Sequence, residues 1–287
     1  MSGTYDALLR DTAVALTAAG IDNARFEARL LMAHATGLSV EQLVARGRDA
    51  APADVAETVR TLAARRVRRE PMAYILGERE FWGLPFKVTP AVLVPRPDSE
   101  TLIEAVLSLL PDRMQPLRIL DCGVGSGCLL LTLLREYPRA QGVGIDASPE
   151  ALAVAGANAE RLGVASRARL LVEDWRQEGW VDRLGGPFDL VVSNPPYIER
   201  AAIERLMPEV SLFEPRLALD GGADGMESYR LLAANGRKLV TSGGAFVVEV
   251  GEGQAIEILG LFAAAGLTPR APWKDLGGIE RVVAAHH

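Results

Sequence analysis

A glycine-rich loop between two apolar runs constrains the fold of this 287-residue chain more than any other feature of its sequence. The first run, Arg118–Asp121, is strand-like, the loop reads Gly-Val-Gly-Ser-Gly over residues 123–127, and the second run begins at Cys128 with helical character. Glycines let a backbone approach a ligand closely, and the N–H groups at a helix start attract an anionic group. Strand, glycine loop and helix in this order predict a parallel α/β sheet that binds a ligand at its carboxyl edge.

Acidic and aromatic side chains end the next two strand-like runs. Asp146 comes nineteen residues after Gly127, a spacing at which a carboxylate binds ribose hydroxyls. Asp174 and Trp175 follow the third run, and we expect them to hydrogen-bond to an adenine ring and flank it. Nicotinamide dinucleotide enzymes use a similar loop, but their pattern is G-x-G-x-x-G, whereas the third glycine here comes two positions after the second.

The run Val191–Ser193 stops abruptly at Asn194-Pro195-Pro196-Tyr197. Neither proline can donate a hydrogen bond to a sheet, so a buried strand must end here. Because ligands bind at the carboxyl edge of an open α/β sheet, the motif is expected to face the same site as the glycine loop. Taken alone, the motif is equally compatible with a turn that only ends a strand.

The motif suits an amide-type nitrogen as the group that reacts. The lone pair of such a nitrogen is delocalised, so a general base alone gives little help. Oxygen acceptors that hold its two N–H bonds orient the nitrogen and favour the pyramidal geometry of attack. We expect these acceptors to be the Asn194 side-chain oxygen and the Pro195 carbonyl, with Pro196 and Tyr197 completing the catalytic and substrate-holding set.

Composition and charge exclude several classes of function. With 49% hydrophobic and 24% charged residues the chain is an ordinary globular protein. Its first 80 residues balance eleven arginines against eleven acidic residues, and the net charge of −6 lies in the remainder. A duplex-DNA-binding surface needs a basic footprint, so no sequence-specific DNA binding is expected. No run approaches the length of a membrane span, and two cysteines and three histidines give no metal pattern; we expect a cytoplasmic protein without a metal.

Three regions follow from the spacing of apolar residues. Residues 1–70 show helical periodicity and predict a small all-α domain, whereas 71–98, broken by Gly and Pro, predict a β-hairpin linker. Strands alternate with helices over 99–287, which predicts a doubly wound, mostly parallel sheet. The Arg65–Arg69 cluster is interpreted as a solvated helix end, with contact to an acidic partner or nucleic acid as the alternative. Asp98 or Ser99 is expected to cap a helix.

Taken together, the glycine loop, Asp146, the Asp174-Trp175 pair and the Asn-Pro-Pro-Tyr motif resemble the class I S-adenosylmethionine-dependent methyltransferases. Flanking segments narrow the resemblance to the peptide chain release factor glutamine methyltransferases, over residues 65–283. Two loop residues depart from that family's usual pattern, since Cys122 and Val124 stand where Leu and Thr are common. The segments that carry the narrower resemblance are Pro71–Gly77, Phe81, Val94–Asp98, Phe213–Leu219 and Asp275–Gly277.

The resemblance implies a seven-stranded sheet and transfer of a methyl group from S-adenosylmethionine to the side-chain amide nitrogen (N5) of a glutamine. That glutamine would lie in the Gly-Gly-Gln motif of class 1 release factors, S-adenosylhomocysteine would be the product, and the helical domain would recognise the substrate. The implied cofactor-binding residues are Gly123, Val124, Gly125, Ser126, Gly127, Asp146, Asp174, Trp175 and Asn194. The implied substrate-binding residues are Asn194, Pro195, Pro196, Tyr197, Phe81 and Arg96.

Two alternatives remain open at this point. An adenine-N6 DNA methyltransferase would flip its target base into the same pocket, but the chain is acidic and has no recognisable target-recognition region. The other alternative is a non-enzymatic module, with helices that bind a partner and a sheet that serves as a scaffold. It would require that three separate loops carry the residues of a cofactor site by coincidence.

Overall fold

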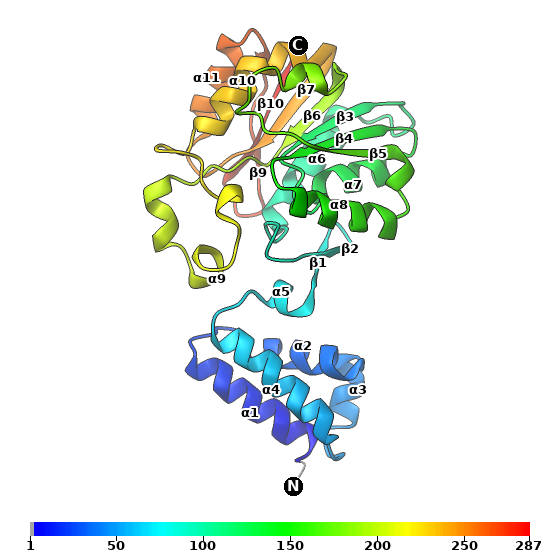
Figure 1. Cartoon of the computed structure of the whole chain (residues 1–287), viewed down its shortest axis with the longest axis vertical. Coiled ribbons are helices and arrows are strands. Elements are labelled where there is room, and N and C mark those ends of the chain that lie inside the picture. The colour runs from blue at the N-terminus through cyan, green and yellow to red at the C-terminus, as the bar shows by residue number, and fades with distance from the viewer. Residues whose placement is uncertain (1–2) are drawn as a thin grey trace. The chain divides into compact units, whose positions relative to one another are not determined.

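The computed structural model describes residues 3–287, which divide into two compact units. One unit consists of the residues up to Gly77 together with Met207–Phe213, and the other of Glu78–Leu206 and Glu214–His287. Each unit encloses apolar cores of its own, and Figure 1 shows the helices of the first unit in blue and cyan, except for the segment Met207–Phe213, which is yellow. Among residues 3–287, no helix combines the length and the apolar character needed to cross a membrane.

The first unit is helical because the apolar residues of its longer helices repeat at helical spacing and turn inward. Leu16, Ala28 and Leu31 are fully buried in its core. A capping box formed by Ser39 and Gln42 starts the third helix. The helices are α1 (Tyr5–Ala18), α2 (Ala24–Thr36), α3 (Val40–Ala45), α4 (Ala53–Val67), α5 (Met72–Leu76) and α9 (Pro208–Ser211).

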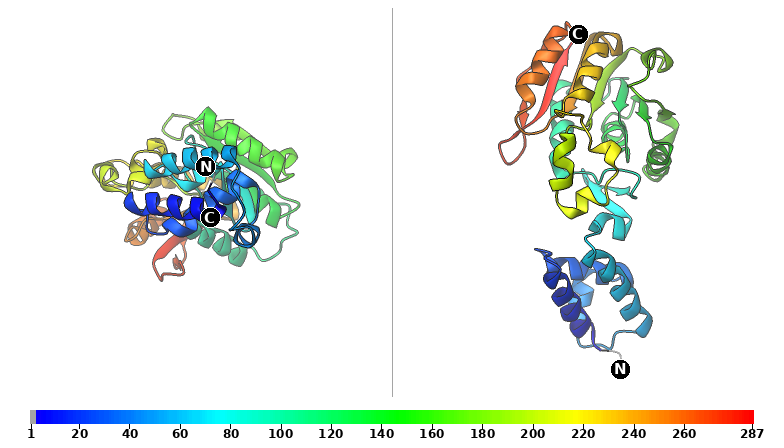
Figure 2. Two further views of the ribbon diagram at one scale, coloured as in Figure 1. Left: turned by 90° about the horizontal axis from the view of Figure 1, so that it is seen from below. Right: turned by 60° about the vertical axis from the view of Figure 1, so that its left-hand side comes forward.

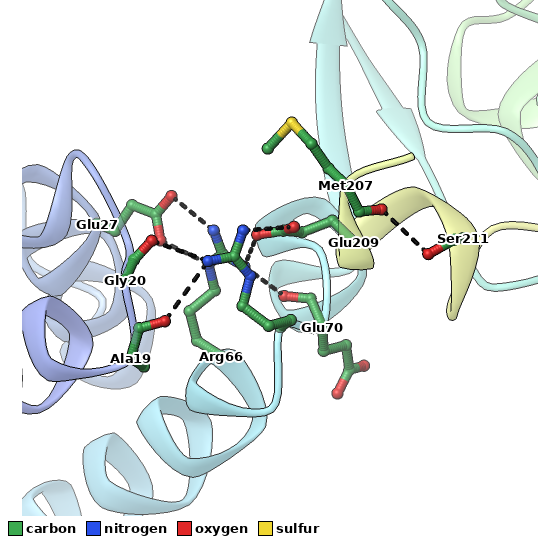
Figure 3. Close-up of polar contacts among 9 residues, drawn as sticks. Ala19, Gly20, Glu27, Arg66, Glu70, Met207, Glu209 and Ser211 are labelled. Atoms are coloured by element: carbon green, nitrogen blue, oxygen red, sulfur yellow. Dashed lines mark hydrogen bonds and ion pairs between the residues drawn. The ribbon is translucent and has the colours of Figure 1, made fainter. Parts of the chain in front are cut away.

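The arginine cluster at the end of α4 is not a solvated helix end, and that interpretation was wrong. Arg66 is only 6% exposed and forms ion pairs with Glu27 at 2.6 Å and with Glu209 at 2.9 Å. Figure 3 shows its guanidinium lying between these two carboxylates. Arg69 also binds Glu209, at 2.8 Å, and Arg65 binds Glu70. Glu209 belongs to the same unit although it lies far along the sequence, and its carboxylate pairs with both Arg66 and Arg69.

The second unit is built on one sheet with the strand order β5-β4-β3-β6-β7-β10-β8, and the short β9 also pairs with β10. Strands β3 to β7 run parallel, whereas β10 runs antiparallel to β7. The predicted α/β fold with a mostly parallel sheet is thereby confirmed, but the sheet has eight strands instead of the implied seven in residues 3–287, because the two-residue strands β8 and β9 both pair with β10. The strands are β3 (Arg118–Cys122), β4 (Gln141–Asp146), β5 (Ala168–Val172), β6 (Phe188–Ser193), β7 (Val240–Glu249), β8 (Thr268–Pro269), β9 (Trp273–Lys274) and β10 (Glu280–His286).

Helices cover both faces of this sheet, as Figures 1 and 2 show. On one face lie α6 (Glu100–Leu109), α7 (Cys128–Glu136) and α8 (Pro149–Arg161), and on the other lie α10 (Glu227–Leu239) and α11 (Ala255–Ala264). Successive residues of β6 point to opposite faces, so Leu190 and Val192 enter the first core while Val191 enters the second. Burial on both faces explains why the strand reads as a continuous apolar run.

A β-hairpin precedes the sheet in the chain, formed by β1 (Glu78–Phe81) and β2 (Leu84–Lys87). The start of α6 differs from expectation: a 3₁₀ turn, η1 (Pro97–Ser99), leads into the helix, and Ser99 makes no capping hydrogen bond. The Ser99 hydroxyl instead forms hydrogen bonds in the site described below. The other 3₁₀ turns are η2 (Ala165–Arg167), η3 (Val181–Arg183), η4 (Arg200–Arg205) and η5 (Arg216–Ala218).

Candidate active site

A cavity of about 560 Å³ opens at the carboxyl ends of strands β3, β4 and β6. Its volume is in the range of pockets that enclose a cofactor or a small substrate. The cavity brings together the three loops predicted from sequence. The predicted site residues that line it are Gly123, Val124, Gly125, Ser126, Asp146, Asp174, Trp175, Asn194, Pro196 and Arg96.

The glycine loop between β3 and α7 needs glycine for two physical reasons. Gly123 and Gly127 have φ angles of +80° and +84°, which side-chain-bearing residues rarely adopt. A Cβ atom at Gly123 would also lie 3.1 Å from Cη2 of Trp175, closer than ordinary van der Waals contact. The indole ring therefore lies directly against the loop backbone, and together they form one wall of the cavity.

Asp146 ends β4 beside this loop and is tied to it through its carboxylate. Oδ2 accepts a hydrogen bond from the Gly125 N–H at 2.9 Å, and Oδ1 accepts one from the Ser148 N–H at 2.9 Å. Burial raises the pKa of Asp146, while these backbone hydrogen bonds partly offset the effect. A carboxylate has about four acceptor positions, so this fixed side chain retains capacity for the hydroxyls of a ribose. The acceptor positions of Asp146 therefore fit a nucleoside-bearing cofactor.

Asp174 lies in the next loop but is already engaged. Both of its carboxylate oxygens bind the Arg176 guanidinium, with Oδ2 2.8 Å from Nη2. The hydrogen bond from Arg176 is the main reason that the pKa of Asp174 lies below its ordinary value. Arg176, which sequence reasoning did not single out, lines the cavity as well.

Asn194 follows the last residue of β6 and connects the cavity to a buried hydrogen-bond chain. Its Nδ2 donates to Ser99 Oγ at 3.2 Å, and the Ser99 hydroxyl donates to Glu249 Oε2 at 2.5 Å. Glu249 ends β7 and is only 2% exposed. Burial raises its pKa to about 7, although the hydrogen bond from Ser99 and the charge of Arg281 act in the opposite direction.

Arg96 faces a second buried carboxyl group. Its Nη2 donates to both oxygens of Glu214 at 2.8 Å, and the Glu214 side chain is 1% exposed. Burial raises the pKa of Glu214 to about 7, with Arg96 acting in the opposite direction. Arg96 itself is 36% exposed and lines the cavity. The arginine therefore joins the cavity wall to a segment more than one hundred residues later in the sequence.

Four predicted residues lie outside the cavity lining. Pro195 is buried, and Gly127 serves as the N-cap of α7. Tyr197 packs partly buried against the core, and its phenol pKa is raised to about 12 by burial and by the charge of Glu249. Phe81 is enclosed in the core, where its ring packs edge-on against Phe86 at 6.1 Å.

Three buried polar residues at the site were not predicted to take part in it. Ser99 and Glu249 form the chain described above, and Asp121, the penultimate residue of β3, is 1% exposed. Asp121 Oδ2 accepts from the Leu130 N–H at 3.2 Å, and burial raises its pKa to about 7. The sequence did contain a signal for two of them, since Asp121 and Glu249 are charged residues within otherwise apolar runs.

Comparisons with known proteins agree with this geometry. Residues 7–77 match the family described as the PrmC N-terminal domain, and residues 119–212 match a methyltransferase domain. The structure resembles a methyltransferase from Pyrococcus furiosus, with a TM-score of 0.52 and 18% identity over 72% of this chain and 90% of that one. It also resembles the hMettl16 catalytic domain, with a TM-score of 0.58 and 14% identity over 78% and 80% of the two chains. At such identities the likeness concerns the fold alone.

Sequence relatives are much closer. The release factor glutamine methyltransferase of Rhodospirillum rubrum is 45% identical over 94% of this chain and 81% of its own length. The protein of the same name from Bradyrhizobium diazoefficiens is 45% identical over 96% of this chain and 92% of its own. Similarity at this level over nearly the whole chain, together with a glycine loop, Asp146 and Asn194 around one cavity, shows that the chain belongs to the release factor glutamine methyltransferase family.

Proposed function

We propose that this protein methylates the side-chain amide nitrogen (N5) of the glutamine in the Gly-Gly-Gln motif of class 1 peptide chain release factors. The observation that carries the proposal is that Asn194 and the glycine loop line one cavity, so an amide-holding group and a cofactor cradle meet there. The names of the relatives support the choice of substrate.

We assign the cofactor, S-adenosylmethionine, to the glycine-loop half of the cavity. Asp146 would bind the ribose hydroxyls and Trp175 would lie beside the adenine, with Asp174 contributing acceptor positions that Arg176 leaves free. The backbone of residues 123–127 would allow close approach of the methionine part. When bound, the cofactor supplies a methyl group activated by the positive charge on sulfur, and S-adenosylhomocysteine is the product.

The role of the Asn-Pro-Pro-Tyr motif is to hold the substrate amide. The Asn194 side-chain oxygen and the Pro195 carbonyl would accept the two N–H hydrogen bonds, which orients the nitrogen for in-line attack. The same acceptors stabilise the positive charge that develops on nitrogen as the N–C bond forms. After transfer the nitrogen is strongly acidic and loses its proton to water, so no dedicated base is required. Pro196 and Tyr197 keep this segment rigid, and Arg96 would contact the substrate loop.

The other parts of the chain have roles under the same proposal. The helical domain, residues 1–70, would recognise the release factor, the segment 71–98 would link it to the catalytic part, and residues 99–287 would carry out the transfer. Because release factors act in translation, the proposal implies a cytoplasmic location.

Mass spectrometry of a purified class 1 release factor tests the proposal. The release factor is incubated with this protein and S-adenosylmethionine, alongside a release factor whose loop glutamine is changed to alanine. We expect a gain of one methyl mass on that glutamine and none on the variant. An unmodified release factor, with cofactor binding intact by calorimetry, would refute the assignment of the substrate, and an adenine-containing duplex would be assayed in the same experiment.

A further inference from the structure

The register of the sheet brings a second, buried group to the catalytic motif. Strands β6 and β7 are parallel neighbours in which Ser193 pairs with Val248. The next residues of the two strands, Asn194 and Glu249, therefore lie side by side at the carboxyl edge. Between them stands Ser99, which is 2% exposed and contributes its hydroxyl from η1.

While Glu249 is ionised, the chemistry of this chain fixes the direction of each hydrogen bond. An ionised carboxylate can only accept, so the Ser99 hydroxyl must donate to Glu249. Having used its single proton, Ser99 Oγ must accept, and the group that it accepts from is the Nδ2 amino group of Asn194. The amide of Asn194 has only two ends, so its Oδ1 is the end that remains for a substrate N–H.

We propose that Glu249 is a positioning residue which, through Ser99, holds the Asn194 side chain with its oxygen directed to the substrate amide. This inference rests on the proposed function, because it explains how the amide-holding acceptor is prevented from presenting its N–H₂ group instead. A flipped Asn194 would place two donors against the donors of a substrate amide, which is repulsive and leaves the substrate N–H bonds unpaired.

The inference predicts that the acceptor orientation is lost when Glu249 is protonated. A neutral Glu249 can donate to Ser99, whose proton is then free to point at Asn194 and to favour the flipped amide. The pKa of Glu249 is about 7, so turnover should be full above this pH and fall as the pH drops through it. The titratable and charged groups that surround Glu249 are Asp98, Arg281, Tyr197, Tyr229 and Cys128.

The first test is steady-state kinetics of Glu249→Gln between pH 5.5 and 9. Glutamine has nearly the same shape but offers Ser99 both a donor and an acceptor, so both directions of the chain become available. We expect kcat to fall about tenfold or more, KM for S-adenosylmethionine to stay unchanged, and the acidic limb of the pH profile to disappear. Glu257→Gln, an exposed glutamate on α11, is the matched control and should behave as wild type.

Ser99→Ala provides a second variant should Glu249→Gln fold poorly. Because the Ser99 hydroxyl links Glu249 to Asn194, its removal should lower kcat and abolish the acidic limb of the kcat profile, as in Glu249→Gln. A merely structural role for Ser99 would lower activity equally at all pH values. A kcat within twofold of wild type in Glu249→Gln, or an acidic limb that persists unchanged there, would overturn the inference.

A readout without substrate separates this inference from the proposed function. In protein labelled at asparagine, the Asn194 N–H₂ signals are identified by their absence from Asn194→Asp, and their shifts are followed by NMR against pH. We expect them to titrate near pH 7 in wild type and not in Glu249→Gln. If no methyl reaches the release factor, the proposed function fails, while this titration still supports the positioning role; signals that do not titrate in wild type overturn it.

Discussion

Replacing Arg96 by methionine should destabilise the second unit in a way that depends on pH. Arg96 is the cation that faces Glu214, whose side chain is 1% exposed. Methionine retains the apolar part of the side chain and removes only the charge. Without this cation the pKa of Glu214 must rise above its present value of about 7, because Arg96 is the group that holds it down.

The magnitude follows from proton linkage. A carboxyl group whose pKa rises on folding stabilises the fold at low pH, and wild type loses this contribution as the pH rises from 4.5 to about 7. Above pH 7 the wild-type carboxyl is ionised and the loss stops, whereas in Arg96→Met it continues to higher pH. Relative to wild type, the free energy of unfolding of Arg96→Met is therefore almost unchanged by this effect at pH 6. At pH 8.5 it is lower by about 2 kcal/mol if Glu214 stays protonated there.

Urea unfolding followed by tryptophan fluorescence measures this loss. All four tryptophans, at positions 82, 175, 180 and 273, belong to the second unit, so the signal reports the unit that contains the pair. Arg113→Met is the matched control, because Arg113 has a similar exposure of 37% but its partner Glu136 is 31% exposed. An exposed pair contributes less than about 1 kcal/mol, and the control loss should be equal at both pH values.

The double variant Arg96→Met with Glu214→Gln completes the cycle. Because glutamine does not ionise, the pH-dependent part of the Arg96→Met effect should vanish in the double variant. An Arg96→Met loss that is the same at pH 6 and pH 8.5, or one that persists in the double variant, would refute the electrostatic explanation.

Three further predictions concern single side chains. Asn194→Ala should lower kcat for glutamine methylation about a hundredfold or more, by analogy with the removal of one preorganised polar contact; turnover like that of wild type would contradict its role. Gly123→Ala should weaken S-adenosylmethionine binding about tenfold in calorimetry, since the new Cβ meets the indole ring, whereas Gly163→Ala, with similar backbone but open space, should not. Arg66→Met should destabilise the helical unit by about 3–5 kcal/mol in hydrogen exchange, because it leaves the largely buried Glu27 without its ion-pair partner and removes one of the two partners of Glu209, whereas Arg60→Met at an exposed pair should change little.

The sequence was sufficient to predict the parts of the site that depend on a single strand end. Asp146 and Asn194 each follow an apolar run, and parallel strands present such positions at a common edge. Both therefore line the same cavity as the glycine loop. The resemblance to the family rested on these motifs together with the flanking segments, and the sequence relatives confirm it.

The parts that were not predicted depend on which elements become neighbours. Glu249 lies beside Asn194 only because β7 is the sheet neighbour of β6, and the strand order is not written in either segment. Ser99 was expected to cap a helix, as any serine at that position could. Instead its hydroxyl donates a hydrogen bond to the buried carboxylate of Glu249. Phe81 was expected to bind substrate because it lies in a segment that resembles the family. In the structure it ends β1 of the hairpin, and its ring is buried in the core.

The helical unit includes Glu209, which is synthesised much later than the rest of the unit, and this affects the newly made chain. A ribosome releases α1 to α5 long before the segment Met207–Phe213, and 143 residues separate Arg66 from Glu209. At ordinary elongation rates this interval corresponds to roughly seven to thirty seconds. During that time Arg66 has Glu27 as a partner but not Glu209, so the unit that forms first during synthesis is completed only late in it. Truncation between the units would have the same effect permanently, since no single cut in the chain yields the whole helical unit.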